Sequence, residues 1–370
     1  MAIIGAGAAG LQLLYEFRQN QAVSPSRILL VDSGDRSEKS WCFWQGSNPI
    51  FEKLIEKKWN ALAFIDEHGI EFRSAIDPMR YHYISSNTFY QYFFTEFIPA
   101  QEGIEVVRGM AQAVKSNAEN FDICMADGEI YAAKQVFDSR FNPADRLTHA
   151  GLYQHFYGKF IRTDSPIFDA EVATLMDFSL AQTDASFSCF HYVLPFSETY
   201  ALVETTVFST QEYALAKYEA IWKSYWDRNF GRIAFELVKE EKGSIPMSIS
   251  PFSLEENGII RIGTAAGQVK ASTGYAFTRM NEDARQIVGG MSRKKPMRFR
   301  FYDRLLLSII KNDTAKIPFV MSQLFKSVSM PRILSFLDEK STLSQEIKIF
   351  SQLPIRLFLK HAWKNLFSAQ

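Results

Sequence analysis

Residues 5–10 read Gly-Ala-Gly-Ala-Ala-Gly, a G-x-G-x-x-G turn that follows a short apolar strand and opens a helical run. Asp32 ends a second apolar strand, 22 residues after Gly10. In this order, Gly5 allows a tight turn, Gly7 lets a pyrophosphate approach the backbone, and Gly10 lets helix and strand pack closely. The helix N-terminus would bind the phosphates and Asp32 a ribose. The pattern therefore predicts a dinucleotide cofactor, without choosing between NAD and FAD.

The strand before the turn has only three residues ahead of Gly5, which leaves open that the natural chain begins further upstream. A second turn lies far downstream. An apolar strand at 259–262 leads into Gly263 and Gly267, and Thr273-Gly274-Tyr275 then precede a helical run. Two-domain FAD enzymes use such a strand, turn and helix to hold the ribityl chain and the flavin pyrimidine edge. This second turn favours FAD.

Glu204 is the candidate acid and base. It lies in the strand 200–208, which carries no other charge. Burial of a carboxyl among apolar side chains raises its pKa, so that it stays protonated near neutral pH and can donate a proton. The alternative is a glutamate on the solvated face of an ordinary strand.

Three motifs follow one another along the chain: Trp41-Cys42-Phe43-Trp44, Glu204-Thr205-Thr206 and Ser272-Thr273-Gly274-Tyr275. Together they are specific, and they resemble the FAD-dependent lycopene cyclases, in particular the bacterial type of lycopene β-cyclase. The other matching segments are 3–11, 83–84, 89–90, 137–140, 192–196, 243–247, 263–275 and 301–307. Two positions depart from the pattern. Thr264 stands where related flavoproteins often have Asp, and Thr205 stands where the family often has a second acid, so that one carboxylate acts alone or finds a partner elsewhere.

The resemblance implies lycopene, a linear C40 polyene, as substrate. A proton adds to a terminal double bond, a neighbouring double bond attacks the tertiary cation, and loss of a ring proton gives a β-ionone ring without net redox change. Reduced FAD would stabilise the cation, with NAD(P)H as the expected reductant. The alternative is a redox flavoenzyme, such as a prenyl-chain reductase or a monooxygenase acting on a large apolar substrate.

The resemblance also assigns the site. Glu204 is the catalytic residue. The cofactor-binding residues are Gly5, Ala6, Gly7, Ala9, Gly10, Asp32, Arg140, Gly263, Gly267, Thr273 and Gly274. The substrate-pocket residues are Trp41, Phe43, Trp44, Tyr192 and Tyr275. For each aromatic residue, plain core packing is the alternative, and for Arg140 it is a surface salt bridge.

The order of the expected helices and strands that position these residues indicates an interleaved α/β (α+β) fold of the two-domain flavoprotein type. Segments 1–40, 81–140 and 258–290 form a Rossmann-like FAD-binding domain. Segments 41–80 and 141–257 form a β-sheet substrate domain, with a helix predicted over 217–239. Residues 291–370 form a basic, amphipathic helical region, whose last helix carries an apolar stripe at Ile355, Leu359, Ala362, Trp363 and Leu366 opposite a basic stripe at Arg356, Lys360 and Lys364.

The whole chain of 370 residues has 41 basic and 41 acidic residues, but the charge is divided along it. Residues 285–370 hold 16 Lys and Arg against five Asp and Glu, a net charge of +11, and residues 1–284 carry −11. The basic tail predicts contact with an anionic membrane surface. The alternative is a helical cap packed on an acidic body. The 32 Phe residues are compatible with an apolar substrate tunnel. We expect no nucleic-acid partner.

Three cysteines without a C-x-x-C motif indicate a reducing compartment, and neither they nor the six histidines have metal-ligand spacing, so no metal site is expected. We find no signal peptide and no apolar run long enough to span a bilayer. The sequence therefore predicts a cytoplasmic protein, peripherally associated with a membrane.

Overall fold

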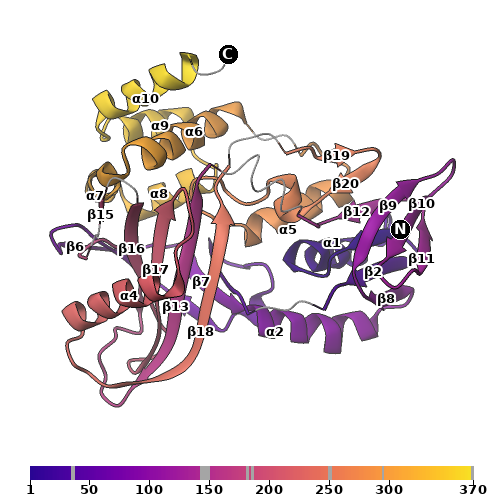
Figure 1. Ribbon diagram of the computed structural model, residues 1–370, viewed down its shortest axis with the longest axis horizontal. Coiled ribbons are helices and arrows are strands. Elements are labelled where there is room, and N and C mark those ends of the chain that lie inside the picture. The colour runs from indigo at the N-terminus through magenta and orange to yellow at the C-terminus, as the bar shows by residue number, and fades with distance from the viewer. Residues whose placement is uncertain are drawn as a thin grey trace.

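The computed structural model describes residues 1–34, 38–141, 151–180, 183–184, 187–248, 252–293 and 296–367. Two large β-sheets lie side by side, and a group of C-terminal helices covers one face of the second (Figure 1). Each amphipathic helix and each alternating strand buries its apolar side chains on one face. The main core lies between the second sheet and the C-terminal helices.

The first sheet is a parallel Rossmann-type sheet with one antiparallel edge strand, in the order β19-β20-β12-β1-β2-β8. Its strands are β1 (Ala2–Ile4), β2 (Ile28–Asp32), β8 (Ile104–Arg108), β12 (Val136–Asp138), β19 (Glu255–Glu256) and β20 (Ile259–Arg261). Helices α1 (Ala8–Gln19), α2 (Ser86–Gln91) and α5 (Phe277–Val288) contribute to the apolar cluster on one face, together with η2 (Tyr92–Phe97) and η3 (Ile98–Ala100). A meander of β9 (Ala111–Ser116), β10 (Phe121–Met125) and β11 (Ile130–Ala133) packs on strands β1, β2 and β12 in another cluster.

The second sheet has eight strands in the order β18-β13-β17-β16-β14-β5-β6, with β15 paired to β16. Its strands are β5 (Ala61–Ile65), β6 (Glu71–Ala75), β13 (Tyr153–Thr163), β14 (Val172–Asp177), β15 (Thr183–Asp184), β16 (Phe187–Pro195), β17 (Tyr200–Ser209) and β18 (Phe235–Pro246). Helix α4 (Leu215–Asn229) covers one face, and the C-terminal helices cover the other.

The helix predicted over 217–239 is wrong in its second half, because α4 ends at Asn229 and strand β18 begins at Phe235. Gly231, with φ +67°, adopts the left-handed conformation that ends helices, and the chain then reverses into the sheet.

A third, smaller sheet of β3 (Ser40–Gln45), β7 (Arg80–Ser85) and β4 (Lys57–Trp59), with the short helix η1 (Glu52–Leu54), stands between the two large ones. Side chains on the two faces of β3 belong to different cores: Trp41 and Phe43 join the cluster around α1, whereas Cys42 and Trp44 join the cluster under the C-terminal helices. This small sheet therefore ties the Rossmann-type sheet to the second sheet.

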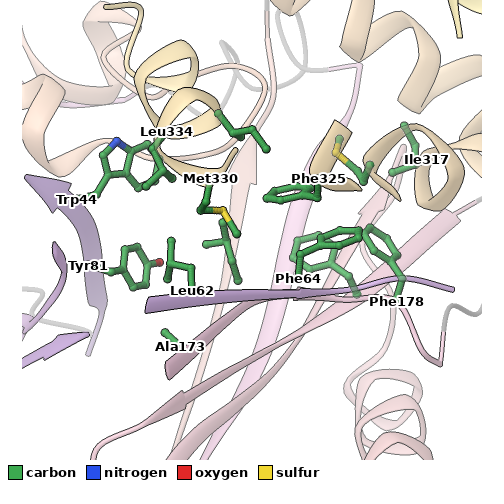
Figure 2. Close-up of a cluster of buried hydrophobic side chains, with 14 of the residues drawn as sticks. Trp44, Leu62, Phe64, Tyr81, Ala173, Phe178, Ile317, Phe325, Met330 and Leu334 are labelled. Atoms are coloured by element: carbon green, nitrogen blue, oxygen red, sulfur yellow. The ribbon is translucent and has the colours of Figure 1, made fainter. Parts of the chain in front are cut away.

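The C-terminal region is helical, as predicted. It consists of α6 (Met297–Asn312), η5 (Thr314–Lys316), α7 (Ile317–Ser327), α8 (Met330–Leu337), α9 (Leu343–Phe350) and α10 (Ile355–Phe367). Figure 2 shows Phe325 of α7 and Met330 and Leu334 of α8 facing side chains of the sheets; the rings of Phe325 and Phe64 stack 4.3 Å apart. Within the described ranges, no helix is both long enough and apolar enough to cross a bilayer.

Helix α10 turns much of its predicted apolar stripe away from the core. Ile355, Leu359 and Trp363 are 53%, 63% and 67% exposed, while Leu357 and Phe358 pack against the main core. His361 fixes this orientation, because its Nδ1 lies 2.7 Å from Ser308 Oγ and its Nε2 lies 2.7 Å from Asp313 Oδ2. The apolar stripe therefore faces outward beside Arg356, Lys360 and Lys364; Leu366 lies outside the described side chains.

Candidate functional site

The N-terminal glycine turn has the shape that a dinucleotide requires. Gly5 has φ +95°, and a Cβ there would lie 2.0 Å from Ser139 Oγ. A Cβ at Gly10 would lie 2.0 Å from the Gly5 carbonyl oxygen, so helix and strand touch at this point. At Gly7 an added Cβ would meet no atom within 4 Å. The turn is thus closed at Gly5 and Gly10 and open at Gly7, where a pyrophosphate would approach the backbone.

The second glycine turn lies against the first. It forms η4 (Gly263–Ala266), and a Cβ added at Gly263 would stand 2.8 Å from Ala9 Cβ. Gly267, with φ +67°, ends this short helix. Gln12 of α1 also donates to the carbonyl of Phe277, at 3.2 Å. Two segments more than 250 residues apart in sequence therefore meet at one place, as a shared ligand would require.

The segment 272–275 continues from this turn toward the second sheet. Gly274, with φ +76°, leaves no room for a side chain, because a Cβ would lie 3.0 Å from both Gln154 Oε1 and Ile245 Cδ1. Within the described part of the chain, the buried Oγ1 of Thr273 and Oε1 of Gln154 have no hydrogen-bond partner. Such orphaned polar atoms fit a site that a polar ligand completes.

Two further predicted cofactor residues lie at the carboxyl ends of parallel strands of the first sheet. Asp32 is buried at the end of β2 and accepts from the backbone N–H of Gly34, at 3.0 Å. Arg140 follows β12 and forms an ion pair with the buried carboxylate of Asp138, at 2.7 Å, while its Nη1 donates to the carbonyl of Ala111. This ion pair holds the Arg140 guanidinium at the carboxyl edge of the sheet, where ligands of such folds bind.

Glu204 lies in the middle of the second sheet, between Tyr192 of β16 and Gly158 of β13. Thr206 Oγ1 donates to Glu204 Oε1, at 2.9 Å. Burial first, and then repulsion by Glu241, raise the pKa of Glu204 well above its usual value. This shift favours the protonated form of the carboxyl, which a proton donor requires.

Thr205, which stands where the family often has a second acid, points to the other face of the sheet. It is fully buried, and its neighbours Val203 and Val207 pack in the cluster under α4. Because side chains alternate along a strand, an acid at position 205 would not reach Glu204.

A group of tyrosines adjoins Glu204. The hydroxyls of Tyr275 and Tyr81 lie 2.9 Å apart, and the hydroxyl of Tyr192 also contacts Tyr275. The Trp44 ring stands edge-on to Tyr275, with centroids 4.6 Å apart. Burial raises the pKa of Tyr192 and of Tyr275, so both hydroxyls stay neutral. Of the predicted pocket residues, the structure thus brings Trp44, Tyr192 and Tyr275 together near Glu204.

The other two predicted pocket residues lie apart from this group. Trp41 and Phe43 project from the opposite face of β3 and stack on Phe277 of α5, with ring centroids 5.3 Å and 5.2 Å away. They belong to the core around α1, so both have the packing role that was the alternative to a place in the substrate pocket.

An apolar cavity of about 110 Å³ lies between the second sheet and the C-terminal helices. Its lining includes Tyr192, Tyr275 and Thr273 on one hand, and Phe350, Leu353 and Phe358 on the other. It therefore connects the surroundings of Glu204 with α9 and α10. The volume equals roughly four waters at about 30 Å³ each, so a long chain enters only if side chains or helices move.

Sequence reasoning missed two members of the site. Tyr81 joins Tyr275, and Glu241 lies near Glu204 on the neighbouring part of the sheet, where Ser40 Oγ donates to Glu241 Oε2 at 2.6 Å. Glu241 stands in the charged run Lys239-Glu240-Glu241-Lys242, which is typical of a solvated face. The available signal was Gly158, a glycine among the bulky residues of strand β13. Among the described residues, no group of three or more His, Cys, Asp or Glu is placed to hold a metal.

The parallel sheet, the paired glycine turns and the second sheet define the fold of Rossmann-type, two-domain flavoproteins, which confirms the predicted fold class. The chain belongs to the lycopene cyclase family: the family model described as lycopene cyclase protein matches residues 1–362, which also confirms the resemblance. No curated protein matches the chain.

Solved structures share the fold at low sequence identity. A geranylgeranyl bacteriochlorophyll reductase-like protein from Thermoplasma acidophilum matches with a TM-score of 0.63 and 11% identity, over 97% of both chains. A variant of HpxO from Klebsiella pneumoniae, complexed with FAD, matches with a TM-score of 0.56 and 11% identity, over 96% of this chain and 99% of that one. BrvH, a flavin-dependent halogenase from Brevundimonas sp. BAL3, matches at 0.54 and 11%, over 95% and 88%.

Proposed function

We propose that this protein is an FAD-dependent lycopene β-cyclase, an intramolecular lyase or isomerase that closes the ends of the linear C40 carotene into β-ionone rings. The observation that carries the proposal is the position of Glu204: a half-buried carboxyl whose pKa is raised by desolvation, next to tyrosines that line an apolar cavity. Its membership in the lycopene cyclase family supports the same substrate class.

The chemistry assigned to the residues is proton transfer. Glu204 gives its proton to a terminal double bond, a neighbouring double bond attacks the resulting tertiary cation, and a ring proton then leaves to a base. No electron is gained or lost. The π faces of Trp44, Tyr192 and Tyr275 would stabilise the positive charge, and the apolar cavity would exclude water that could trap it.

The described residues fit FAD, because the turn at Gly7 is open, the two glycine turns adjoin, and Thr273 carries an unsatisfied buried hydroxyl. We assign the holding of the cofactor to the residues predicted for it: Gly5, Ala6, Gly7, Ala9, Gly10, Asp32, Arg140, Gly263, Gly267, Thr273 and Gly274. Bound in its reduced form, FAD would supply negative charge near the cation, with NAD(P)H as the proposed reductant.

We also propose that the C-terminal helices dock on an anionic membrane surface, from which a lipid-dissolved polyene would be taken. The apolar side chains Ile355, Leu359 and Trp363 form an exposed stripe along α10, and Leu343 and Ile347 of α9 are 60% and 62% exposed. Basic side chains flank the stripe, as in helices that lie in a membrane interface.

The alternative of a helical cap neutralised by an acidic body has less support. Several C-terminal cations pair with acids of their own region, as in Arg298–Glu346 at 3.1 Å and Lys360–Asp313 at 2.6 Å. Residues that line the cavity, Leu353 and Phe358, lie in the same turn and helix as the exposed stripe, which would give the substrate a short path from the bilayer.

A pigment assay tests the function. The purified protein, with FAD and either NADPH or dithionite under anaerobic conditions, is mixed with lycopene in vesicles, and products are identified by chromatography and mass. We expect a product with the mass of lycopene and a β-ring absorption spectrum. A product that gains or loses hydrogen or oxygen would instead support the redox flavoenzyme.

A further inference from the structure

Gly158 of strand β13 lies between two glutamates. It is paired with Glu204 of β17 on one side and with Glu241 of β18 on the other. Directly opposed residues of neighbouring strands point to the same face of a sheet, so both carboxyl side chains lie on the face where Gly158 has none. A Cβ at position 158 would lie 3.3 Å from Glu204 Cβ and 3.3 Å from Glu241 Cγ. The missing side chain leaves the space across which the two carboxyls approach.

The two carboxyl groups lie close enough for a hydrogen bond between them. Two ionised carboxylates only accept hydrogen bonds, so a hydrogen bond between them needs a proton. Each has one further donor: Thr206 Oγ1 for Glu204, at 2.9 Å, and Ser40 Oγ for Glu241, at 2.6 Å. Glu241 is only 7% exposed, so two negative charges at this place would be strongly unfavourable.

We propose that Glu204 and Glu241 form a carboxyl pair that holds one proton, in which Glu204 is the proton donor and Glu241 is a positioning residue that accepts its hydrogen bond. The inference rests on the proposed function and supplies the partner that Thr205 does not provide. In the reaction, the O–H bond of Glu204 breaks as a C–H bond forms on the polyene. The pair then carries two negative charges, and Glu204 takes back the ring proton when that C–H bond breaks. The pair ends with one proton, and no electron is transferred.

The surrounding charges place the proton on Glu204. Burial raises the pKa of Glu241, and the charge of Glu38 raises it further, while the hydrogen bonds with Ser40 and Glu204 and the charge of Lys239 lower it. Lys239 itself is ion-paired with Glu38, at 3.0 Å. The side that faces Glu204 carries Tyr192, Tyr275 and Cys42, and all three are kept neutral by burial. The titratable groups that face the pair therefore favour the ionised form at Glu241.

The test compares Glu241→Gln with Glu240→Gln in the holoenzyme. Both variants remove one negative charge from β18, but Glu240 lies on the opposite face, where Tyr157 donates to it. Activity requires protonated Glu204 and is lost as pH rises through its pKa. Loss of the Glu241 charge lowers that pKa, so the alkaline limb of the pH–rate profile should move down by about one pH unit or more. Glu240→Gln should leave it in place. An unchanged limb in a folded Glu241→Gln protein overturns the proposal.

Infrared difference spectroscopy gives a readout that does not depend on activity. A protonated buried carboxyl has its own C=O stretch, which should titrate at a lower pH in Glu241→Gln than in the wild type and vanish in Glu204→Gln. If lycopene is not converted but the band behaves in this way, the proposed function fails and the pair stands. If the band titrates identically in wild type and Glu241→Gln, the pair is refuted, whatever the activity. Should Glu241→Gln not fold, Gly158→Ala places a methyl between the carboxyls and should shift the band in the same direction.

Discussion

The hydroxyl groups of Tyr81 and Tyr275 lie 2.9 Å apart and join strand β7 to the segment that follows the second glycine turn. Tyr81 is 1% exposed and comes from the small sheet between the two large ones. The contact therefore fixes the cofactor-side segment against the wall of the cavity, next to Tyr192 and Glu204.

We expect Tyr275→Phe to slow ring formation about tenfold, equivalent to ~1.4 kcal/mol in the barrier, because it removes the hydroxyl contacts and keeps the ring. Flavin content and thermal stability should stay close to those of the wild type. Initial rates of the pigment assay measure the effect. Tyr131→Phe, which alters a hydroxyl on the outer meander, is the matched control. Equal rates for the two variants would show that the Tyr275 hydroxyl has no part in the reaction.

Alanine substitutions at two glycines of the first turn should affect different properties, cofactor binding at Gly7 and protein stability at Gly10. Gly7→Ala should fold normally, because an added Cβ meets nothing within 4 Å, but should weaken FAD binding about tenfold, since the methyl would occupy the space assigned to the pyrophosphate. Gly10→Ala should instead destabilise the protein, because its Cβ would lie 2.0 Å from the Gly5 carbonyl oxygen. Thermal melts and flavin titration of the apoprotein separate the two effects. Unaltered FAD affinity in Gly7→Ala would contradict the assigned phosphate position.

This difference between glycines shows why much of the fold was predictable. A turn that has no room for side chains at Gly5 and Gly10 can be recognised from its glycine spacing. A strand can be recognised from its alternating apolar and polar residues. The end of α4 was harder to predict, because Phe235 to Lys239 continue a helix-compatible run and only Gly231 signals the reversal. The face that α10 turns toward the core depends on the bonds of His361 to Ser308 and Asp313, which are about 50 residues away and leave no local pattern.

Glu204→Gln should abolish cyclisation while FAD stays bound. It should also change how stability depends on pH. The folded protein holds the Glu204 proton to a higher pH than the unfolded chain, whose glutamates titrate near pKa ~4.3. The wild type therefore loses stability as pH rises from that value toward the raised pKa, by at most ~1.4 kcal/mol per pH unit for one proton.

The glutamine lacks this titration and can still accept the hydrogen bond of Thr206. The melting temperature of Glu204→Gln relative to the wild type should thus rise as the pH increases above the usual glutamate pKa of ~4.3. Differential scanning calorimetry measures it, with Glu240→Gln as control. A difference that does not change with pH would mean that Glu204 is not buried in the protonated form.

A site residue was predictable where the pattern of its own strand marked it. It was not predictable where only the pairing of several strands brings it into the site. Glu204 stands out because its own strand has no other charge. Glu241 belongs to a charged run 37 residues later, and only the register of two strands on either side of Gly158 brings the carboxyls together. Trp41 and Trp44 share one motif, but strand alternation sends them into different cores.

The exposed stripe of α10 predicts where the protein meets lipid. Replacing Ile355, Leu359 and Trp363 by Ser removes apolar side chains that are more than half exposed, so folding should be little affected. Binding to vesicles of phosphatidylglycerol and phosphatidylcholine should fall about tenfold or more, because interfacial binding scales with buried apolar area. Co-flotation measures the bound fraction, and circular dichroism checks the helices.

The control is the double variant Ile70→Ser and Ile130→Ser, at two residues of the acidic body that are 54% and 65% exposed. Wild-type binding should weaken with added salt, since basic residues flank the stripe. If the triple variant binds vesicles as the wild type does, the α10 face is not the membrane contact.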